Sequence, residues 1–159
     1  MSDPSSTHGA GIRWQRDGQP FTDRRYNRRH EWHFDGGAVV AGSSSPHAVR
    51  VPYSDPAAVD PEEAFVASLA SCHMLWFLDV ACRAGWVVDS YHDDASGVLG
   101  PRADGKLVMT LVTLRPDARF AEPRPDTAEI ERLHHVAHEA CFIANSVTSE
   151  VRCEPVLPT

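Results

Sequence analysis

The chain has 159 residues, of which 42% are hydrophobic, and its formal net charge is −7 at pH 7. This length fits one domain with a hydrophobic core of its own. The negative charge argues against nucleic acid as the main partner. The longest apolar stretch, residues 64–81, also contains Ser68, Ser71, His73 and Asp79, so we do not expect it to span a membrane.

The first residues, 1–11, are polar and include Pro4 and two glycines, so we expect a flexible tail followed by a single domain over residues 12–159. No stretch resembles a secretory signal. The four cysteines are few for this length. Together these features favour a cytoplasmic protein, in which thiols are kept reduced and a disulfide is more often catalytic than structural.

The first third of the chain predicts short strands. Residues 26–34 and 38–41 are compatible with strands, and they flank Asp35-Gly36-Gly37, which is typical of a turn. Residues 47–51 are a third candidate strand.

A long helix is predicted from Asp60 to Gly85. Asp60 can cap the helix, Pro61 suits its first position and Glu63 completes a capping box. Gly85 is a suitable C-terminal stop. Apolar residues lie on nearly all sides of its middle, so we expect the helix to be buried at the centre of the protein or of a dimer.

The second half predicts three more strands, at residues 86–91 or as far as 99, 107–114 and 147–154. Asp104-Gly105 is a hairpin turn signal before the middle one. Prolines 116, 123 and 125 predict a loop, which leads into a second helix over residues 126–142. The order β-β-β-α-β-β-α-β predicts an α+β domain with two main helices against a curved antiparallel sheet.

Two cysteines on the predicted helices are candidates for chemistry. Cys72 lies in the middle of the first helix and Cys141 closes the second. Neither belongs to a Cys-x-x-Cys pair, so a thioredoxin-type dithiol or a zinc ribbon has no sequence support. We interpret them as a redox pair assembled in space; the alternative is that each is an inert small apolar residue. Cys82 and Cys153 are interpreted as structural.

A reactive thiol needs a cation or several hydrogen-bond donors nearby. His73 projects about 100° away from Cys72 on a helix, so it is a poor activator. An arginine is the better candidate because it stays charged. Asp79 stands four residues before Arg83, which predicts an ion pair along the helix.

The second helix is rich in histidine, and His134 and His138 share a face with Cys141. One interpretation is a zinc site with Cys72 as the fourth ligand. Another makes Cys141 a resolving thiol with the histidines around it. In a third, the histidines form a hydrated helix edge.

Two motifs stand at informative spacings. Asp60-Pro61-Glu62-Glu63 is followed by Cys72, ten residues after Glu62, and Ala137-His138-Glu139-Ala140-Cys141 closes the second helix. In these motifs and in the order of elements, the chain resembles the OsmC/Ohr family of thiol-dependent hydroperoxide reductases. Members of that family carry Asn/Asp-Pro-Glu-Glu before a cysteine at this spacing and Ala-His-x-x-Cys on the second helix. The resemblance covers most of the chain.

The resemblance implies an OsmC-like fold, an intertwined homodimer and a peroxidase that acts on organic or hydrogen peroxide. It makes Cys72 the peroxidatic thiol, Cys141 the resolving thiol and Glu62 the carboxylate that positions an arginine. Cys72 would pass through a sulfenic acid to an intramolecular disulfide, which an external dithiol reduces. No resident cofactor or metal is implied.

The activating arginine departs from the family pattern. Ohr-type members place it just before Asp-Gly, where this chain has Phe34. OsmC-type members place it about twenty residues before the reactive cysteine, where Arg50 is available. We favour Arg50, with Arg28 and Arg29 as further candidates. The Cys-Pro that follows the second helix in the family is replaced by Cys141-Phe142.

Reach along the helix adds an argument that does not depend on the family. Ten residues separate Glu62 from Cys72, which is about 15 Å along a straight helix. If both serve one site, Glu62 must come from the partner subunit. The alternatives to a peroxidase are a metal-binding or redox-sensing module that uses Cys72, Cys141, His134 and His138, and a small-molecule-binding protein without turnover.

Overall fold

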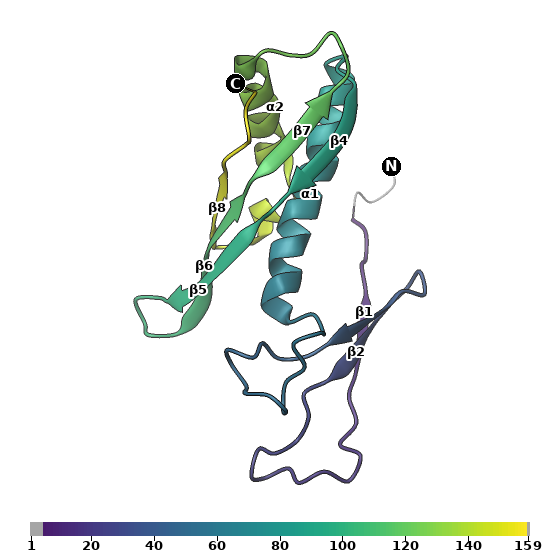
Figure 1. Cartoon of the computed structure of the whole chain (residues 1–159), viewed down its shortest axis with the longest axis vertical. Helices are drawn as coiled ribbons and strands as arrows, with labels where there is room; N and C mark the ends of the chain where they lie inside the picture. The colour runs from purple at the N-terminus through teal and green to yellow at the C-terminus, as the bar shows by residue number, and fades with distance from the viewer. Residues whose placement is uncertain (1–4, 159) are drawn as a thin grey trace. The chain divides into compact units, whose positions relative to one another are not determined.

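The computed structural model describes residues 5–158 and has an α+β architecture with two main helices, as the sequence predicts (Figure 1). Within the predicted domain the chain forms two compact units, the first ending at Pro61 and the second beginning at Glu62. The boundary lies at the start of the long helix, and each unit has its own hydrogen-bonded strands.

The first unit contains a three-stranded antiparallel sheet in the order β1-β2-β3, formed by Ala10–Arg13, His30–Phe34 and Val39–Gly42. The predicted turn between the last two strands is confirmed. Gly37 has φ 88° and its amide donates to the carbonyl of Phe34 over 3.0 Å. A positive φ is readily available to glycine, which explains the residue choice.

Two expectations for the first unit differ from the structure. Strand β1 begins inside the expected tail, because Ala10 and Gly11 pair with Phe34 and His33 of β2. Residues 1–4 of that tail lie outside the described residues. Residues 47–51 form turns instead of a strand, since their amides bond locally, as when Val49 donates to Ser45 over 3.0 Å.

Helix α1 spans Pro61–Arg83 without interruption, as predicted. Gly85 has φ 84° and ends the helix in a Schellman motif, in which its amide bonds to Cys82 and that of Trp86 bonds to Ala81. The predicted pair between Asp79 and Arg83 is present at 2.9 Å.

Only one stripe of α1 is fully buried within the single chain: Leu69, His73, Phe77 and Ala81. Other apolar side chains of this helix are accessible, and Leu75 is 60% exposed. The helix is also long and apolar enough, by length and composition alone, to cross a membrane, a criterion that core helices of soluble proteins meet as well. The expected burial on all sides of the helix is therefore not seen within the described residues of one chain.

The second unit contains two small sheets. Strands β4 (Val88–Asp93) and β7 (Pro116–Phe120) form an antiparallel pair. In the other sheet the order is β5-β6-β8, formed by Ser96–Pro101, Leu107–Leu114 and Glu150–Cys153. Strand β8 runs parallel to β6, whereas the sequence predicts an antiparallel sheet throughout.

The sequence predicts a loop where β7 lies. Pro116 is the first residue of this strand and is paired with Asp93, a position where the missing amide hydrogen costs little. The region expected as one strand up to residue 99 is divided between β4 and β5. The hairpin turn at Asp104-Gly105 is confirmed, with Gly105 at φ 80°.

Helix α2 spans Thr127–Ala140. The side chain of Asp126 caps it by accepting from the amide of Glu129 over 2.8 Å. It ends two residues before the predicted bound, because Cys141 adopts an extended conformation at φ −64° and ψ 113°. A short 3₁₀ turn, η1 (Ala144–Ser146), follows.

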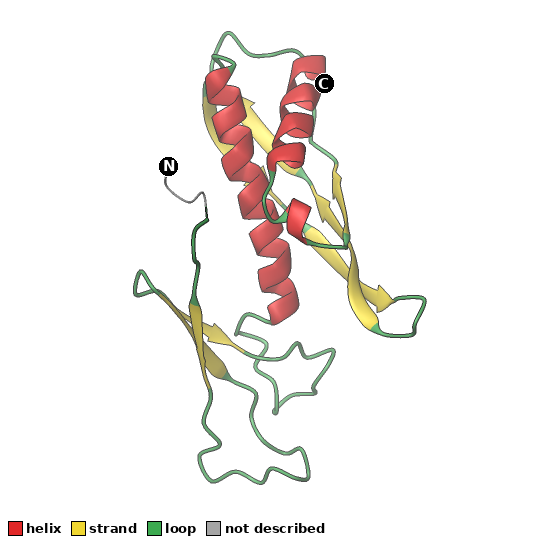
Figure 2. Cartoon of the chain, turned by 180° about the vertical axis from the view of Figure 1, so that it is seen from behind, coloured by secondary structure: helices red, strands yellow, loops and turns green. Residues whose placement is uncertain are grey.

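The two helices lie side by side against one face of the strands of the second unit (Figure 2). Phe77 and Ala81 of α1 pack with Leu133 and Ala137 of α2, and side chains of β4 and β7 cover this cluster. Nearer the N-terminus of α1, Leu69 packs with Val112 and Leu114 of β6. This packing sets the register between the helices and places Cys72, midway along α1, beside the end of α2.

Candidate thiol site

The thiols of Cys72 and Cys141 lie close enough together for the side chain of Cys72 to help raise the pKa of Cys141. Cys72 is half-buried on α1, whereas Cys141 is only 1% exposed and forms the C-cap of α2. Both are free thiols. Two cysteines far apart in the sequence are therefore brought together inside the second unit, as a redox pair requires.

The turn after α2 holds Cys141 in place. Its sulfur accepts from the amide of Ala144 over 3.4 Å, and its carbonyl accepts from the amide and the side chain of Asn145, each over 3.0 Å. The same Asn145 side chain donates to the carbonyl of Glu139 over 2.9 Å. These bonds fix the backbone on both sides of the thiol, so its position does not depend on side-chain packing alone.

Burial is the main reason that the pKa of Cys141 rises from 9.0 to about 11, and the hydrogen bond with Cys72 adds to it. At neutral pH Cys141 is therefore a protonated thiol. Its S–H is therefore available as a hydrogen-bond donor beside Cys72.

Two aromatic residues stand close to the thiols along the chain. Trp76 is one helical turn after Cys72, and Phe142 directly follows Cys141. Their rings meet edge to face with centroids 5.2 Å apart, and Phe142 is 69% exposed. Phe142 thus adds exposed aromatic surface directly after Cys141 in the chain.

The interpretation of Cys72, Cys141, His134 and His138 as zinc ligands gains no support from the structure. Among residues 5–158, the His, Cys and acidic side chains that gather closely enough to hold a metal are instead His73, His134 and Cys153. His134 and Cys141 share a helical azimuth, but seven residues separate them by about 10 Å along the axis. Cys141 also stands at the end of the helix, as its C-cap.

The buried histidines face each other across the two helices. Nε2 of His73 lies 3.0 Å from Nδ1 of His134, and Sγ of Cys153 lies 3.6 Å from the same Nε2. The expectation that His73 points away from Cys72 agrees with this arrangement. Cys153, interpreted from the sequence as structural, belongs to a polar cluster.

Burial lowers the pKa of His73 from 6.5 to about 4 and that of His134 to about 3, because the imidazolium form is poorly solvated there. Burial also raises the pKa of Cys153 to about 12, and the charge of Asp93 adds to the effect. At neutral pH the cluster consists of two neutral imidazoles and a thiol.

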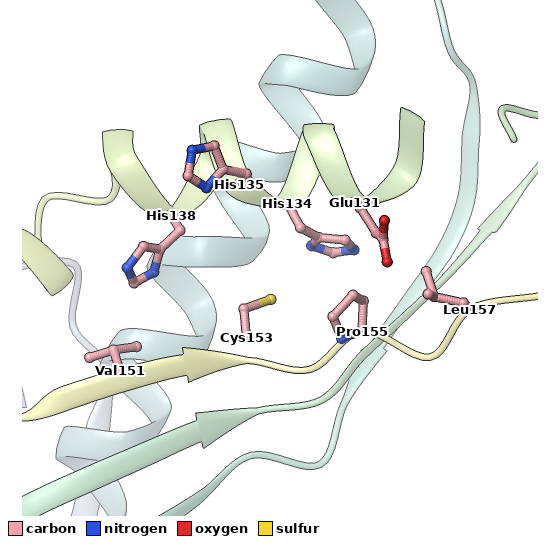
Figure 3. A pocket seen from close by; sticks show the side chains of 8 residues that line it. All are labelled: Glu131, His134, His135, His138, Val151, Cys153, Pro155 and Leu157. Carbon is pink, nitrogen blue, oxygen red and sulfur yellow. The ribbon is translucent and has the colours of Figure 1, made fainter. Parts of the chain in front are cut away.

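A pocket of about 320 Å³ opens onto this cluster between α2 and β8 (Figure 3). His134 and His138 project into it from the helix, towards Cys153 on the strand. Glu131 and His135 also line it, together with Val151, Pro155 and Leu157.

The three candidate arginines belong to the first unit. Arg29 pairs with Asp55, and this ion pair helps to lower the pKa of that carboxyl, after a hydrogen bond from the amide of Ala57. Arg28 donates to the carbonyls of Arg24 and Tyr26. Arg50 is exposed, and its guanidinium carbon lies 5.8 Å from the ring centroid of Tyr53.

No acidic partner of Arg50 occurs among the described residues. Of the three arginines, Arg50 therefore has the fewest polar interactions with the rest of the chain. Glu62 is half-buried in the first turn of α1. Because this helix is unbroken, the distance of about 15 Å between Glu62 and Cys72 along one chain holds. The roles of Arg50 and Glu62 stay predictions.

Sequence reasoning did not find the grouping of His73 with Cys153. The available signal was a histidine in the buried stripe of an apolar helix, since an imidazole buried there needs a polar partner. That signal does not reveal which residue the partner is, because His134 and Cys153 come from other elements.

Comparison with known proteins defines the family. The family model for OsmC-like protein matches residues 54–155. An OsmC-like protein of unknown function from Vibrio cholerae has 50% sequence identity and a TM-score of 0.93, covering 96% of this chain and 100% of that one. No match was found among curated proteins.

Two organic hydroperoxide resistance proteins share the fold at lower identity. The protein from Elizabethkingia anophelis has a TM-score of 0.74 and 17% identity, covering 99% of this chain and 100% of its own. OhrB of Bacillus subtilis has a TM-score of 0.69 and 19% identity, with 95% and 98% covered. With the family match over most of its length and a half-identical relative, the chain belongs to the OsmC-like protein family.

Proposed function

We propose that the protein is a cysteine-based peroxidase that reduces organic hydroperoxides, working as a cytoplasmic homodimer with an external dithiol as reductant. The observation that carries the proposal is the contact between Cys72 and Cys141, because a two-thiol peroxidase needs its sulfurs within bonding reach. Two proteins of the same fold are named for organic hydroperoxide resistance, which supports the substrate class.

The first step is attack by the thiolate of Cys72 on the outer oxygen of the peroxide. A sulfur–oxygen bond forms, the O–O bond breaks, and the alkoxide leaves as an alcohol after taking up a proton. Cys72 is oxidised to a sulfenic acid while the peroxide is reduced by two electrons. A nearby arginine would stabilise the negative charge on the departing oxygen.

In the second step Cys141, as its thiolate, attacks the sulfur of the sulfenic acid. The S–S bond forms, the S–O bond breaks, and the oxygen leaves as water after protonation. The raised pKa of Cys141 keeps it protonated until this stage. An external dithiol then supplies two electrons and two protons to regenerate both thiols.

Organic peroxides are favoured over hydrogen peroxide by the surroundings of the thiols. Trp76, one helical turn after Cys72, and Phe142, next to Cys141 in the chain, form an edge-to-face aromatic pair. Such a surface can bury the organic group of a hydroperoxide, and each buried methylene is worth about 0.8 kcal/mol. Hydrogen peroxide has no group that gains from this contact.

Helix α1 supports the homodimer. Its large apolar side chains are only partly covered in one chain, and Leu75 is 60% exposed. Each such side chain that stays in water lacks the stabilisation of about 1.5–3 kcal/mol that its burial would give. A second copy of the chain would cover them, and it would also bring its Glu62 towards the first chain's Cys72.

The direct test is a thiol count and intact mass after one equivalent of an organic hydroperoxide. We expect a loss of two hydrogens, two blocked thiols mapped to Cys72 and Cys141, and one equivalent of alcohol. A Cys82→Ser variant is the matched control, because Cys82 is exposed on the same helix and should not take part. Unchanged thiols, or oxidation at Cys82 instead, would refute the peroxidase.

A further inference from the structure

We propose that His73, His134 and Cys153 form a binding site for Zn²⁺, separate from the thiol pair. The three residues come from α1, α2 and β8, and their ligand atoms all lie within 4.8 Å of one another. Two imidazole nitrogens and one thiolate are a donor set that suits zinc. The site does not depend on peroxidase activity, since neither Cys72 nor Cys141 belongs to it.

Two of the three spacings between donor atoms are close to those around a tetrahedral ion. With Zn–N bonds of about 2.0 Å and a Zn–S bond of about 2.3 Å, tetrahedral geometry puts nitrogen atoms about 3.3 Å apart and nitrogen about 3.5 Å from sulfur. Nε2 of His73 lies 3.0 Å from Nδ1 of His134 and 3.6 Å from Sγ of Cys153. Small rotations of the rings would open a position between the three atoms.

Both histidines are buried and contact each other, so an ion would have to bind the two nitrogens that face each other. His73 is 1% exposed and His134 is 3% exposed, so their polar atoms need partners within the protein. They share one hydrogen bond, while Nδ1 of His73 and Nε2 of His134 have no partner in the part of the chain that the structure describes. An ion would bind the two facing nitrogens, and each ring would carry its proton on the far nitrogen.

The pocket provides an entry path and a fourth coordination position. Cys153 is half-buried and lines the pocket of about 320 Å³ shown in Figure 3. Water can occupy the fourth position there. Nδ1 of His138 is buried without a partner among the described residues and belongs to the same pocket, so this ring is a candidate to replace the water.

Charge favours the cation as well. Binding breaks the S–H bond of Cys153 and forms a Zn–S bond, and the proton passes to the solvent. The negative charges of Asp93 and Glu154 act on Cys153, and they attract a divalent ion. Magnesium and calcium prefer oxygen ligands, so this nitrogen and sulfur set selects against them.

The test is a titration of the reduced, chelator-treated full chain with Co²⁺, followed by displacement with Zn²⁺. We expect one Co²⁺ per chain, the strong visible bands of tetrahedral Co²⁺, a thiolate-to-cobalt charge-transfer band and release of one proton. Zn²⁺ should abolish the bands and protect Cys153 from alkylation. The Cys153→Ser variant should bind Co²⁺ about 100-fold more weakly or worse, because it loses a ligand rather than an outer contact.

Matched controls separate this site from other ligands. His135→Gln removes an exposed histidine of the same pocket, and Cys82→Ser removes an exposed thiol; both should bind as the wild type does. A variant with Cys72→Ser and Cys141→Ser should also keep the charge-transfer band. Absence of the band in the wild type, its survival in Cys153→Ser, or its loss in the double variant would overturn the proposal.

Discussion

Nε2 of His73 and Nδ1 of His134 lie 3.0 Å apart across the packed helices α1 and α2. The rings are nearly parallel, with an interplanar angle of 5°. Phe77 stacks on His134 with ring centroids 4.1 Å apart, which joins this polar contact to the apolar core. The two imidazoles thus belong to the packed interface between α1 and α2. Their hydrogen bond to each other requires that both rings stay neutral.

The folded protein should lose stability as the pH falls below about 6.5. In the folded state the pKa of His73 is about 4 and that of His134 about 3, against 6.5 when unfolded. Above pH 6.5 both residues are mostly neutral in the folded and in the unfolded chain, so their protonation does not lower the free energy of unfolding. At lower pH only the unfolded chain takes up these protons, so the free energy of unfolding should fall by roughly 3–4 kcal/mol between pH 7 and pH 5.

Urea denaturation at these two pH values measures the effect. His134→Gln should reduce the pH dependence by about half, because one of two titrating groups is gone. The exposed His135 provides the control, and His135→Gln should leave it unchanged. Equal stability of the wild type at pH 7 and pH 5 would contradict neutral burial of the pair.

The two cysteines should have separable roles in turnover. Cys72→Ser should abolish peroxide consumption, because no sulfur remains to attack the O–O bond. Cys141→Ser should consume one equivalent and then stop, with Cys72 progressing to sulfinic acid at excess peroxide. Intact mass spectrometry would show two added oxygens on Cys72. Normal turnover of Cys141→Ser with a dithiol would exclude Cys141 as the resolving residue.

Arg50 should promote the reactivity of Cys72. Arg50→Ala should slow alkylation of Cys72 at neutral pH several-fold, because a cation near a thiolate stabilises the reactive form. Arg50→Lys should keep part of the rate. Peptide mapping after timed alkylation gives the rate for Cys72 itself. Arg29→Ala is the comparison, since Arg29 is paired with Asp55; a larger loss there than in Arg50→Ala would reassign the role.

A mixed dimer tests whether Glu62 acts across subunits. In a heterodimer of Glu62→Gln and Cys72→Ser chains, isolated through two different tags, one site would combine the intact Glu62 of one chain with the intact Cys72 of the other. We expect about half the wild-type activity, because the second site lacks both groups. Each variant alone, as a homodimer, should be nearly inactive. An inactive heterodimer would place both residues of each site in the same chain.

Features that depend on near neighbours could be predicted from the sequence. Helix α1 follows from its apolar run and its Schellman stop at Gly85, and Asp126 caps α2 as its residue type suggests. The turns at Gly37 and Gly105 follow from positive φ angles that glycine readily adopts. In each case the hydrogen bonds that decide the conformation join residues a few positions apart.

Pairings between distant segments were decided only by the tertiary structure. Strands β1 and β7 exist because β2 and β4 offer their backbone groups, and neither strand has a strong pattern of its own. From the sequence, His134 is predicted to lie near Cys141, because both residues fall on the same face of a helix. Packing of α1 and β8 against α2 instead gave His134 the partners His73 and Cys153, because a buried imidazole bonds to whatever polar group its packing neighbours bring within reach.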